Sequence, residues 1–385
     1  MLEYALRGDR RYWSWICALL GIMVVAFLFY LRQASYGLGI TGLGRDVPWG
    51  LYIAQFTFLV GVAASSVMVV LPYYLHDFRE FGKLTILGEL LVIPSIIMCM
   101  VFVIVDMGQP SRILNVLLYP TPHSMMFWDM VVLGVYLLLN IIISRVVLDA
   151  ERKSIPPPGW IRPIIILSIP WAFSIHTVTA FLYSGLAARP FWLTAILAPR
   201  FLASAFAAGP ALLILFCVIL RKVSRFDAGH APLQKLAVIV TYAMTVNVFL
   251  MLVEIFTAMY SDIPEHVRHF QLMYFGLEGN ASLVPWMWVA AVLAVLALVL
   301  LINPRTRRNE PVLILACSAT FISLWIDKGL AMVITGFIPS PLAAVPKYRP
   351  TVPETLISLG IYASGLLIVT VLYKIALSVR ERLAV

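Results

Sequence analysis

The sequence predicts an all-α integral membrane protein with about ten transmembrane helices, for three reasons. Of its 385 residues, 62% are hydrophobic and only 12% are charged, whereas soluble domains are roughly half apolar and about a quarter charged. Ten apolar stretches are each long enough to cross a bilayer, which takes about 20 residues. The Lys and Arg residues are also shared unevenly among the connections between these stretches.

The expected spans follow one another with short connections rich in Pro and charge, such as "IPPPGW" and "LINPRTRRNE". The first span is too long for a signal peptide and lacks a small-residue cleavage site. The second begins after "VPWG" and the sixth after "APR". We place the ten spans at roughly 13–32, 50–75, 84–106, 125–148, 162–186, 198–220, 234–260, 284–303, 311–337 and 355–379.

The positive charges predict the direction of each span. Of the 28 Lys and Arg residues, 19 lie in the N-terminus, the even-numbered connections and the C-terminus, and only eight lie in the odd-numbered connections. Because basic residues stay on the cytoplasmic side, we expect a multi-pass protein of the cytoplasmic membrane with both termini in the cytoplasm. This distribution also accounts for the net charge of +9 without a nucleic-acid partner.

A weak internal repeat predicts two four-helix bundles, formed by spans two to five and six to nine, with flanking helices. Pro48 and Pro199 are 151 residues apart, and His176 and Lys328 are 152 apart. We therefore divide one membrane domain, residues 1–385, into four parts. They are a peripheral helix and outer loop (12–47), a first bundle (48–190), a second bundle (191–345), and a last helix and tail (346–385).

Few ionisable groups fall within the spans, and most of them lie in the outer half. They are Glu89, Asp129, His176, Glu254, Asp327 and Lys328, with Asp106 at a span end. Such groups normally face a bundle interior and mark proton, ion or substrate routes. Glu89, Asn140 and Asn247 form a sparse trail toward the inner side.

Two of these positions allow a functional and a purely structural interpretation. Asp327 and Lys328 are about 100° apart on a helix, so each needs a partner on another span, and Glu254 is the expected partner of Lys328. They form either a structural ion pair or a proton relay. His176, beside Thr177, is either a proton carrier or a buried imidazole satisfied by a hydroxyl group.

The His and Cys residues of the sequence also argue against several kinds of cofactor site. A membrane haem needs two facing axial His ligands, yet His176 is the only His expected deep in a span. The four Cys residues are scattered singly, without metal, cluster or disulfide spacing, and no P-loop occurs. We expect no haem, no iron–sulfur cluster and no metal site in this chain.

Four ordered motifs carry a resemblance to a known family. They are "VPWGLYIAQFTFLVGVAASS", "VDMGQPSRILNVLLYPTPHSMMFWDM", "SIHTVTAFLYSGLAARPFW" and "APRFLASAFAAGPAL". The chain resembles the NrfD / polysulfide reductase membrane subunits over essentially its whole length, in their ten-helix branch. "WIDKGLAMVITGFIPSPL" is most similar to DsrP of the DsrMKJOP complex, and the hydrogenase protein HybB is the nearest alternative.

The resemblance implies a quinone-interacting subunit of a respiratory oxidoreductase complex, linked to sulfur or sulfite metabolism. Such a subunit has no redox centre and no catalytic residue of its own. It exchanges electrons between menaquinone or another exchangeable quinone and an extracytoplasmic ferredoxin-like iron–sulfur subunit, here DsrO-like. A multihaem cytochrome c and a cytochrome b-type membrane subunit would complete the complex in the lipid bilayer.

The resemblance also implies roles for residues. His176 and Asp106 would line the quinone headgroup, supported by Asp129 and Thr177. The proton pathway would contain Glu89, Asn140, Glu254, Asp327 and Lys328. A proton-coupled transporter and a passive anchor for an iron–sulfur partner are the alternatives from other functional classes.

Overall fold

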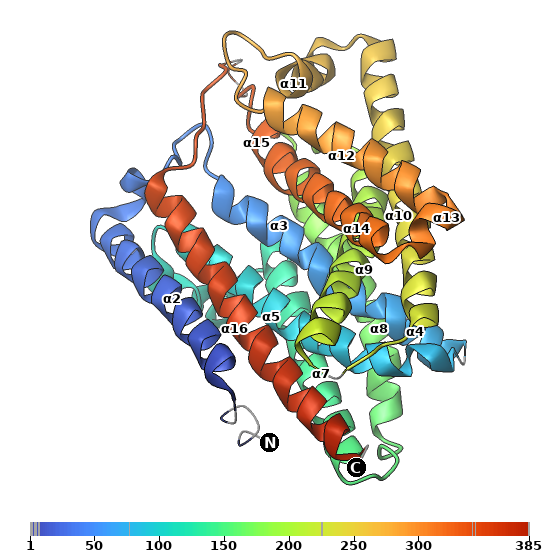
Figure 1. Ribbon diagram of the computed structural model, residues 1–385. Helices are drawn as coiled ribbons and strands as arrows, with labels where there is room; N and C mark the ends of the chain where they lie inside the picture. Colours follow the sequence, from blue (N-terminus) through green and yellow to red (C-terminus); the bar gives the residue numbers. More distant parts are fainter. Residues whose placement is uncertain are drawn as a thin grey trace.

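Within the residues that it describes, a computed structural model contains ten helical spans long and apolar enough to cross a membrane, which confirms the all-α membrane architecture (Figure 1). The structure describes residues 3, 6, 8–76, 78–224, 226–340, 342 and 344–383, without the side chains of residues 65 and 381–383.

Of the ten described spans, eight are single long helices, and the second and ninth are interrupted. The single helices are α2 (Arg10–Tyr36), α5 (Gly82–Asp106), α7 (Met125–Arg152), α8 (Ile161–Ser184), α9 (Leu197–Val223), α10 (His230–Ser261), α12 (Val284–Ile302) and α16 (Val352–Leu383). The second span consists of α3 (Leu51–Ala63), the 3₁₀ turn η2 (Ala64–Ser66) and α4 (Val67–Leu75). The ninth consists of α14 (Glu310–Leu324), the π-helical segment η5 (Trp325–Ala331) and α15 (Met332–Thr335).

Both ends of the helical array lie on the same side of the molecule. Figure 1 shows that α2 begins and α16 ends at one end, here called the terminal end, as an even number of crossings requires. The short helix α11 (Pro264–Tyr274) lies at the opposite end, here called the loop end. The positive charges of the sequence predict that the terminal end is cytoplasmic.

Helix α3 lies at the centre of the array. All thirteen of its residues are buried, and it packs against α5, α8, α9, α16 and the π-helical segment. Within residues 48–190, α5 packs on α7 and α7 on α8. Within residues 191–345, α9 packs on α10 and α14, and α12 on α14. Helix α2 packs mainly on α16, and α16 packs on α5. The division into two bundles stays a prediction.

A buried carboxylate holds the start of α16 against the start of α3. Thr351 and Glu354 form a capping box, in which the backbone N–H of Thr351 donates to Glu354 Oε2 (2.8 Å). Tyr348 Oη donates to Glu354 Oε1 (2.9 Å) and accepts from the backbone N–H of Leu51 (2.7 Å). A Cβ at Gly50 would lie 2.3 Å from Tyr348 Oη, so only glycine allows this contact.

Candidate functional site

His176 is the most enclosed ionisable group of the site predicted from the sequence. It lies 15 residues into α8, about 22 Å from the start of that helix and nearer the loop end. Its side chain is fully buried, and neither Nδ1 nor Nε2 has a hydrogen-bond partner within the described residues. Buried polar atoms normally have partners, so this imidazole has donor and acceptor capacity available for a bound molecule.

Asp129 lies on α7, across from the helix of His176, and is held by a threonine. Thr179 Oγ1 lies 2.6 Å from Asp129 Oδ1 and donates to it, while also lying 2.7 Å from the carbonyl oxygen of Ile175. Thr177 instead donates to the carbonyl oxygen of Phe173 in its own helix (3.0 Å). Of the two threonines, it is therefore Thr179 that joins α8 to Asp129.

Asp106 ends α5 near the capping box of α16. Its Oδ1 is buried without a hydrogen-bond partner among the described residues, and Glu354 is the charged group that influences it most. Tyr183, two helical turns beyond His176, is fully buried near the end of α8. The Tyr183 hydroxyl is hydrogen-bonded to Thr57 on α3. This bond ties the loop end of α8 to α3.

Arg200 organises the acidic groups of residues 191–345. It lies three residues into α9, and its Nη2 lies 2.7 Å from both Asp327 Oδ1 and Oδ2. Its Nη1 donates to Glu254 Oε2 on α10 (2.8 Å). Two carboxylates therefore share one guanidinium, whose planar fork suits this geometry. The three side chains form a buried ion triad with a formal charge of −1.

Lys328 does not pair with Glu254, so that expectation from the sequence is wrong. Its Nζ lies 3.4 Å from the carbonyl oxygen of Phe201 and 4.3 Å from the centroid of the Phe201 ring. A Cβ at Gly61 of α3 would lie 3.1 Å from the same Nζ. Glu254 forms an ion pair with Arg200 instead, and Lys328 reaches the junction between α3 and α9.

The adjacent charges lie in the π-helical segment Trp325–Ala331. A π-helical turn is rare and often occurs at functional positions, because its extra residue shifts side chains relative to an α-helix. Here Asp327 reaches the Arg200 side chain, and Lys328 reaches the Phe201 carbonyl. Both charged side chains of the segment therefore reach α9, at Arg200 and at Phe201.

A line of polar side chains continues along α7 from Asp129 toward the terminal end. Tyr136, Asn140 and Ser144 are all buried on one face, four residues apart. Asn140 Nδ2 donates to the Tyr136 carbonyl oxygen (2.8 Å), and the Tyr136 hydroxyl lies 3.0 Å from Ser66 Oγ in the 3₁₀ turn of the second span. From Asp129 to Ser144 this face spans about 22 Å.

Glu89 belongs to the same region at the terminal end. It is buried in α5, and its Oε2 has no hydrogen-bond partner in the described part of the chain. Helix α5 packs on α7, the helix of Asn140. Glu89 and Asn140 thus lie on adjacent helices, whereas Glu254, Asp327 and Arg200 form the separate ion triad.

A comparison with protein families identifies the chain. The family model of the polysulphide reductase NrfD matches residues 39–338, which is 300 of the 385 residues. The chain belongs to the NrfD family. It is therefore a multi-pass membrane protein, and its ten spans are those of a membrane subunit.

Three curated relatives of this NrfD-family chain are named as parts of reductase or oxidoreductase complexes. A Halobacterium salinarum protein, provisionally named as a membrane subunit of dimethyl sulfoxide reductase, is 25% identical over 92% of this chain and 89% of its own length. A selenate reductase subunit of Mesobacillus selenatarsenatis is 21% identical, over 74% of each chain. The Hdr-like menaquinol oxidoreductase integral membrane subunit of Archaeoglobus fulgidus is 21% identical, over 74% of this chain and 69% of its own length.

The polar groups of this NrfD-family chain also border two small cavities. Each has a volume of about 10 Å³, close to the space that one water molecule needs. Asp327 and Asn247 line both cavities, and Asn247 Oδ1 has no hydrogen-bond partner among the described residues. The triad therefore has room for hydration on two sides. In the described residues, no group of three or more His, Cys, Asp and Glu side chains could hold a metal ion.

Reasoning from the sequence misses two residues of this arrangement. Arg200 falls inside the predicted sixth span, 198–220, yet its charge is counted with the outer connection; in the structure it lies within α9 and is buried. Its signal is present in the sequence: an arginine directly beside a long apolar run needs carboxylate partners once it is buried. Thr179 is missed in favour of Thr177, because spacing along one helix does not reveal which threonine faces α7.

Proposed function

We propose that this NrfD-family protein is the quinone-exchanging membrane subunit of a respiratory oxidoreductase complex. The observation that carries the proposal is His176, a fully buried imidazole with both nitrogens unpartnered among the described residues, close to the Asp129–Thr179 hydrogen bond. A quinone headgroup presents two carbonyl oxygens that accept hydrogen bonds, and an imidazole N–H can supply one. The relative named as a menaquinol oxidoreductase subunit supports menaquinone, or a related quinone, as the exchangeable partner.

In this proposal a quinone supplies the two-electron, two-proton chemistry, and the chain supplies position and protons. His176 would orient a carbonyl oxygen and hold a proton at one ring nitrogen, because imidazole can both donate and accept. Asp129, fixed by Thr179, would be the next proton-holding group. Asp106, with its unpartnered Oδ1, would serve the same purpose from the end of α5. Thr177 would be at most a neighbour, because it bonds to its own helix.

Two routes could supply those protons. The buried face of α7, with Asn140 and with Glu89 nearby, leads toward the terminal end. Protons taken along this route would cross most of the membrane, and electron transfer to a headgroup near the loop end would then move charge across the bilayer. A second route would pass Glu254 and Asp327 to Lys328. We propose the α7 route as the one that crosses the membrane.

The proposed electron partner is an extracytoplasmic ferredoxin-like iron–sulfur subunit at the loop end. We further propose a DsrP-like role in sulfur or sulfite metabolism, with a multihaem cytochrome c and a cytochrome b-type subunit in the complex. The motif around the π-helical segment supports this choice, and a HybB-like hydrogenase complex is the alternative. In either complex the chain itself would carry neither haem nor iron–sulfur cluster.

The test is quinone binding and quinone-linked electron transfer by the purified complex carrying His176→Ala. We expect a loss of binding of roughly five- to 150-fold, because removing one partner of a buried hydrogen bond costs about 1–3 kcal/mol. His176→Gln should retain part of it. His123→Ala, at an exposed histidine of the chain, is the matched control. Unchanged binding in a fully assembled His176→Ala complex would favour the anchor or transporter hypothesis.

A further inference from the structure

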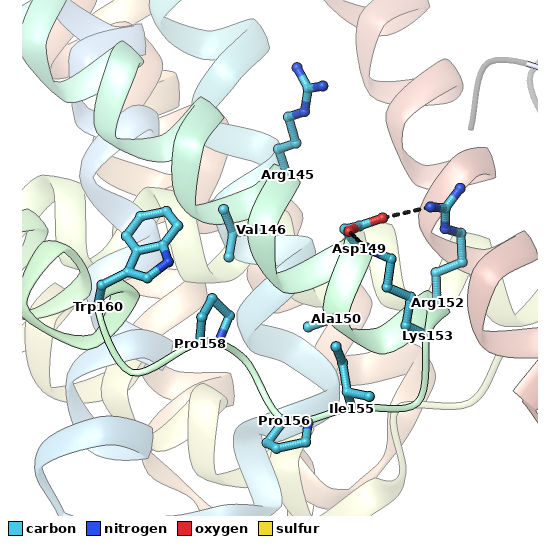
Figure 2. Close-up of a pocket in the computed structure, with 10 residues that line it drawn as sticks. All are labelled: Arg145, Val146, Asp149, Ala150, Arg152, Lys153, Ile155, Pro156, Pro158 and Trp160. Carbon is cyan, nitrogen blue, oxygen red and sulfur yellow. Dashed lines mark hydrogen bonds and ion pairs between the residues drawn. The ribbon is translucent and has the colours of Figure 1, made fainter.

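A cavity of about 810 Å³ opens at the terminal end, on the opposite side of the membrane from Asp129 (Figure 2). It lies between the end of α7 and the linker that leads into α8, and Ile155 and Trp160 form part of its wall. Both side chains are exposed. Tryptophan prefers the boundary between headgroups and acyl chains, so this cavity is expected at the level of the lipid headgroups.

The cavity is positively charged. Arg145, Arg152 and Lys153 line it, together with Asp149. Asp149 pairs with Arg152 (2.7 Å) and with Lys153 (2.6 Å), whereas the side chain of Arg145 has no ion pair or hydrogen bond within the described residues. One carboxylate among three cations leaves a formal charge of +2. Figure 2 shows Arg145 extending away from the linker turn at Pro156, while Arg152 points to Asp149.

The charged residues continue an apolar stripe on the outside of α7. Leu138, Ile142, Arg145, Asp149 and Arg152 are spaced by four, three, four and three residues, which places them on one helix face. Leu138 and Ile142 are exposed and apolar. Arg145 lies about 10 Å deeper along α7 than Arg152, and its long side chain can reach back to the headgroup level. One end of the stripe is therefore suited to contact with acyl chains, and the other end is suited to contact with phosphate groups.

We propose that this cavity binds the phosphodiester headgroup of an anionic membrane lipid, with an acyl chain lying along Leu138 and Ile142. Arg145 and Lys153 would bind the phosphate from two sides, and Trp160 would cover the glycerol region. Basic pockets between transmembrane helices on one side of a membrane are suited to such headgroups. A free phosphate ion would use the same cations but would gain nothing from the apolar stripe, so the lipid is the occupant that the whole surface fits.

The experiment measures lipid binding to the purified, delipidated protein by native mass spectrometry, with phosphatidylglycerol and phosphatidylcholine of equal chain length. Wild type should bind phosphatidylglycerol preferentially. Each cation removed should weaken that binding roughly fivefold, so Arg145→Gln is expected to lose about fivefold and Arg145→Gln with Lys153→Gln about 25-fold. Binding of phosphatidylcholine should change little in either variant.

Arg308→Gln is the matched control, because Arg308 is an exposed, unpaired arginine of the described chain that lies outside the cavity, in α13 (Pro304–Arg308). It should bind phosphatidylglycerol like wild type, and Arg145→Lys should retain most of the affinity. Melting temperatures in detergent identify any variant that is misfolded. Equal phosphatidylglycerol binding by wild type and the double variant would overturn the proposal. So would full displacement of the lipid by inorganic phosphate at an ionic strength at which chloride has no effect.

Discussion

Arg200 Nη2 lies 2.7 Å from each carboxylate oxygen of Asp327, so a single guanidinium nitrogen contacts the whole carboxylate. The same guanidinium binds Glu254 through Nη1. Asp327 needs an opposite charge at membrane depth, and Arg200 supplies it from another helix. Lys328, the sequence neighbour of Asp327, contacts the Phe201 carbonyl oxygen instead.

Arg200→Met should strongly destabilise the protein. It would leave the carboxylates of Asp327 and Glu254 buried without a cation, and breaking a buried ion pair on one side typically costs about 3–5 kcal/mol. We expect poor accumulation and a lower melting temperature in detergent. Neutralising the two acids as well, with Glu254→Gln and Asp327→Asn, should recover part of the loss. A single Arg200→Met protein that melts like wild type would contradict the triad.

Lys328→Met should behave differently. In the described residues Lys328 contacts a carbonyl oxygen and an aromatic ring but no carboxylate, so its removal leaves no unpaired acid. We expect a melting temperature close to that of wild type and a slower quinone-linked proton uptake in proteoliposomes, because Lys328 belongs to the second proposed route. Lys222→Met, at an exposed lysine of α9, should change neither quantity. Loss of stability as large as that of Arg200→Met would assign Lys328 a packing role instead.

Substitutions of Thr177 and Thr179, the two threonines near His176 in α8, should have clearly different effects on turnover. Thr179→Val removes the hydrogen bond to Asp129 and is expected to reduce quinone-linked turnover about as much as Asp129→Asn, roughly tenfold for a lost bond of about 1–1.5 kcal/mol to a charged or buried acceptor. Thr177→Val serves as the matched exchange, because it removes only a bond within its own helix. The double variant of Thr179 and Asp129 should be no worse than Asp129→Asn alone. Equal effects at both threonines would remove the Asp129–Thr179 bond from the site.

His269 predicts a pH dependence at the loop end. Burial lowers the pKa of this side chain from 6.5 to about 4, its ring stacks on Phe191, and its Nδ1–H donates to the carbonyl oxygen of Glu265. As the pH falls below 6.5, His269 becomes protonated in the unfolded chain but stays neutral in the folded protein. The stability from neutral His269 is thus complete above pH 6.5 and is lost progressively down to about pH 4.

Melting temperatures measured between pH 8 and pH 4 should therefore show a slope that begins near pH 6.5 and flattens near pH 4. His269→Phe keeps an aromatic ring against Phe191 without a titrating group, and it should remove that part of the slope. An unchanged slope in His269→Phe would assign the acid sensitivity to other groups.

The helical spans could be predicted closely, because about 20 apolar residues between polar connections have few alternatives. The span expected at roughly 284–303 is α12, Val284–Ile302. The interruptions could not be predicted. The 3₁₀ turn at Ala64–Ser66 does not change the apolar pattern, and Asp327 and Lys328 in the π-helical segment Trp325–Ala331 mark polar positions without indicating a change of helix type.

For the site, the sequence predicts which residues are buried and polar but not which of them pair. Spacing places Asp327 and Lys328 about 100° apart, yet it cannot show that both reach α9, Asp327 at Arg200 and Lys328 at the Phe201 carbonyl oxygen. The pairing of Arg200 is missed because hydropathy places it at the start of the sixth span without showing that α10 and the π-helical segment present carboxylates to it. Pairing is decided by the packing of helices distant in sequence, which no local pattern contains.

The complete burial of α3 has a consequence for biosynthesis. Lipid cannot solvate this helix in the finished protein, because all thirteen residues from Leu51 to Ala63 face other parts of the chain. One of its contacts, the π-helical segment, begins 274 residues after Leu51 (325 minus 51). At a synthesis rate of about 5–20 residues per second, translation of that stretch takes roughly 14–55 s. During this interval Gln55 and Thr57 must be sheltered by helices already made or by the insertion machinery, so the second span depends on temporary partners until the ninth span is inserted.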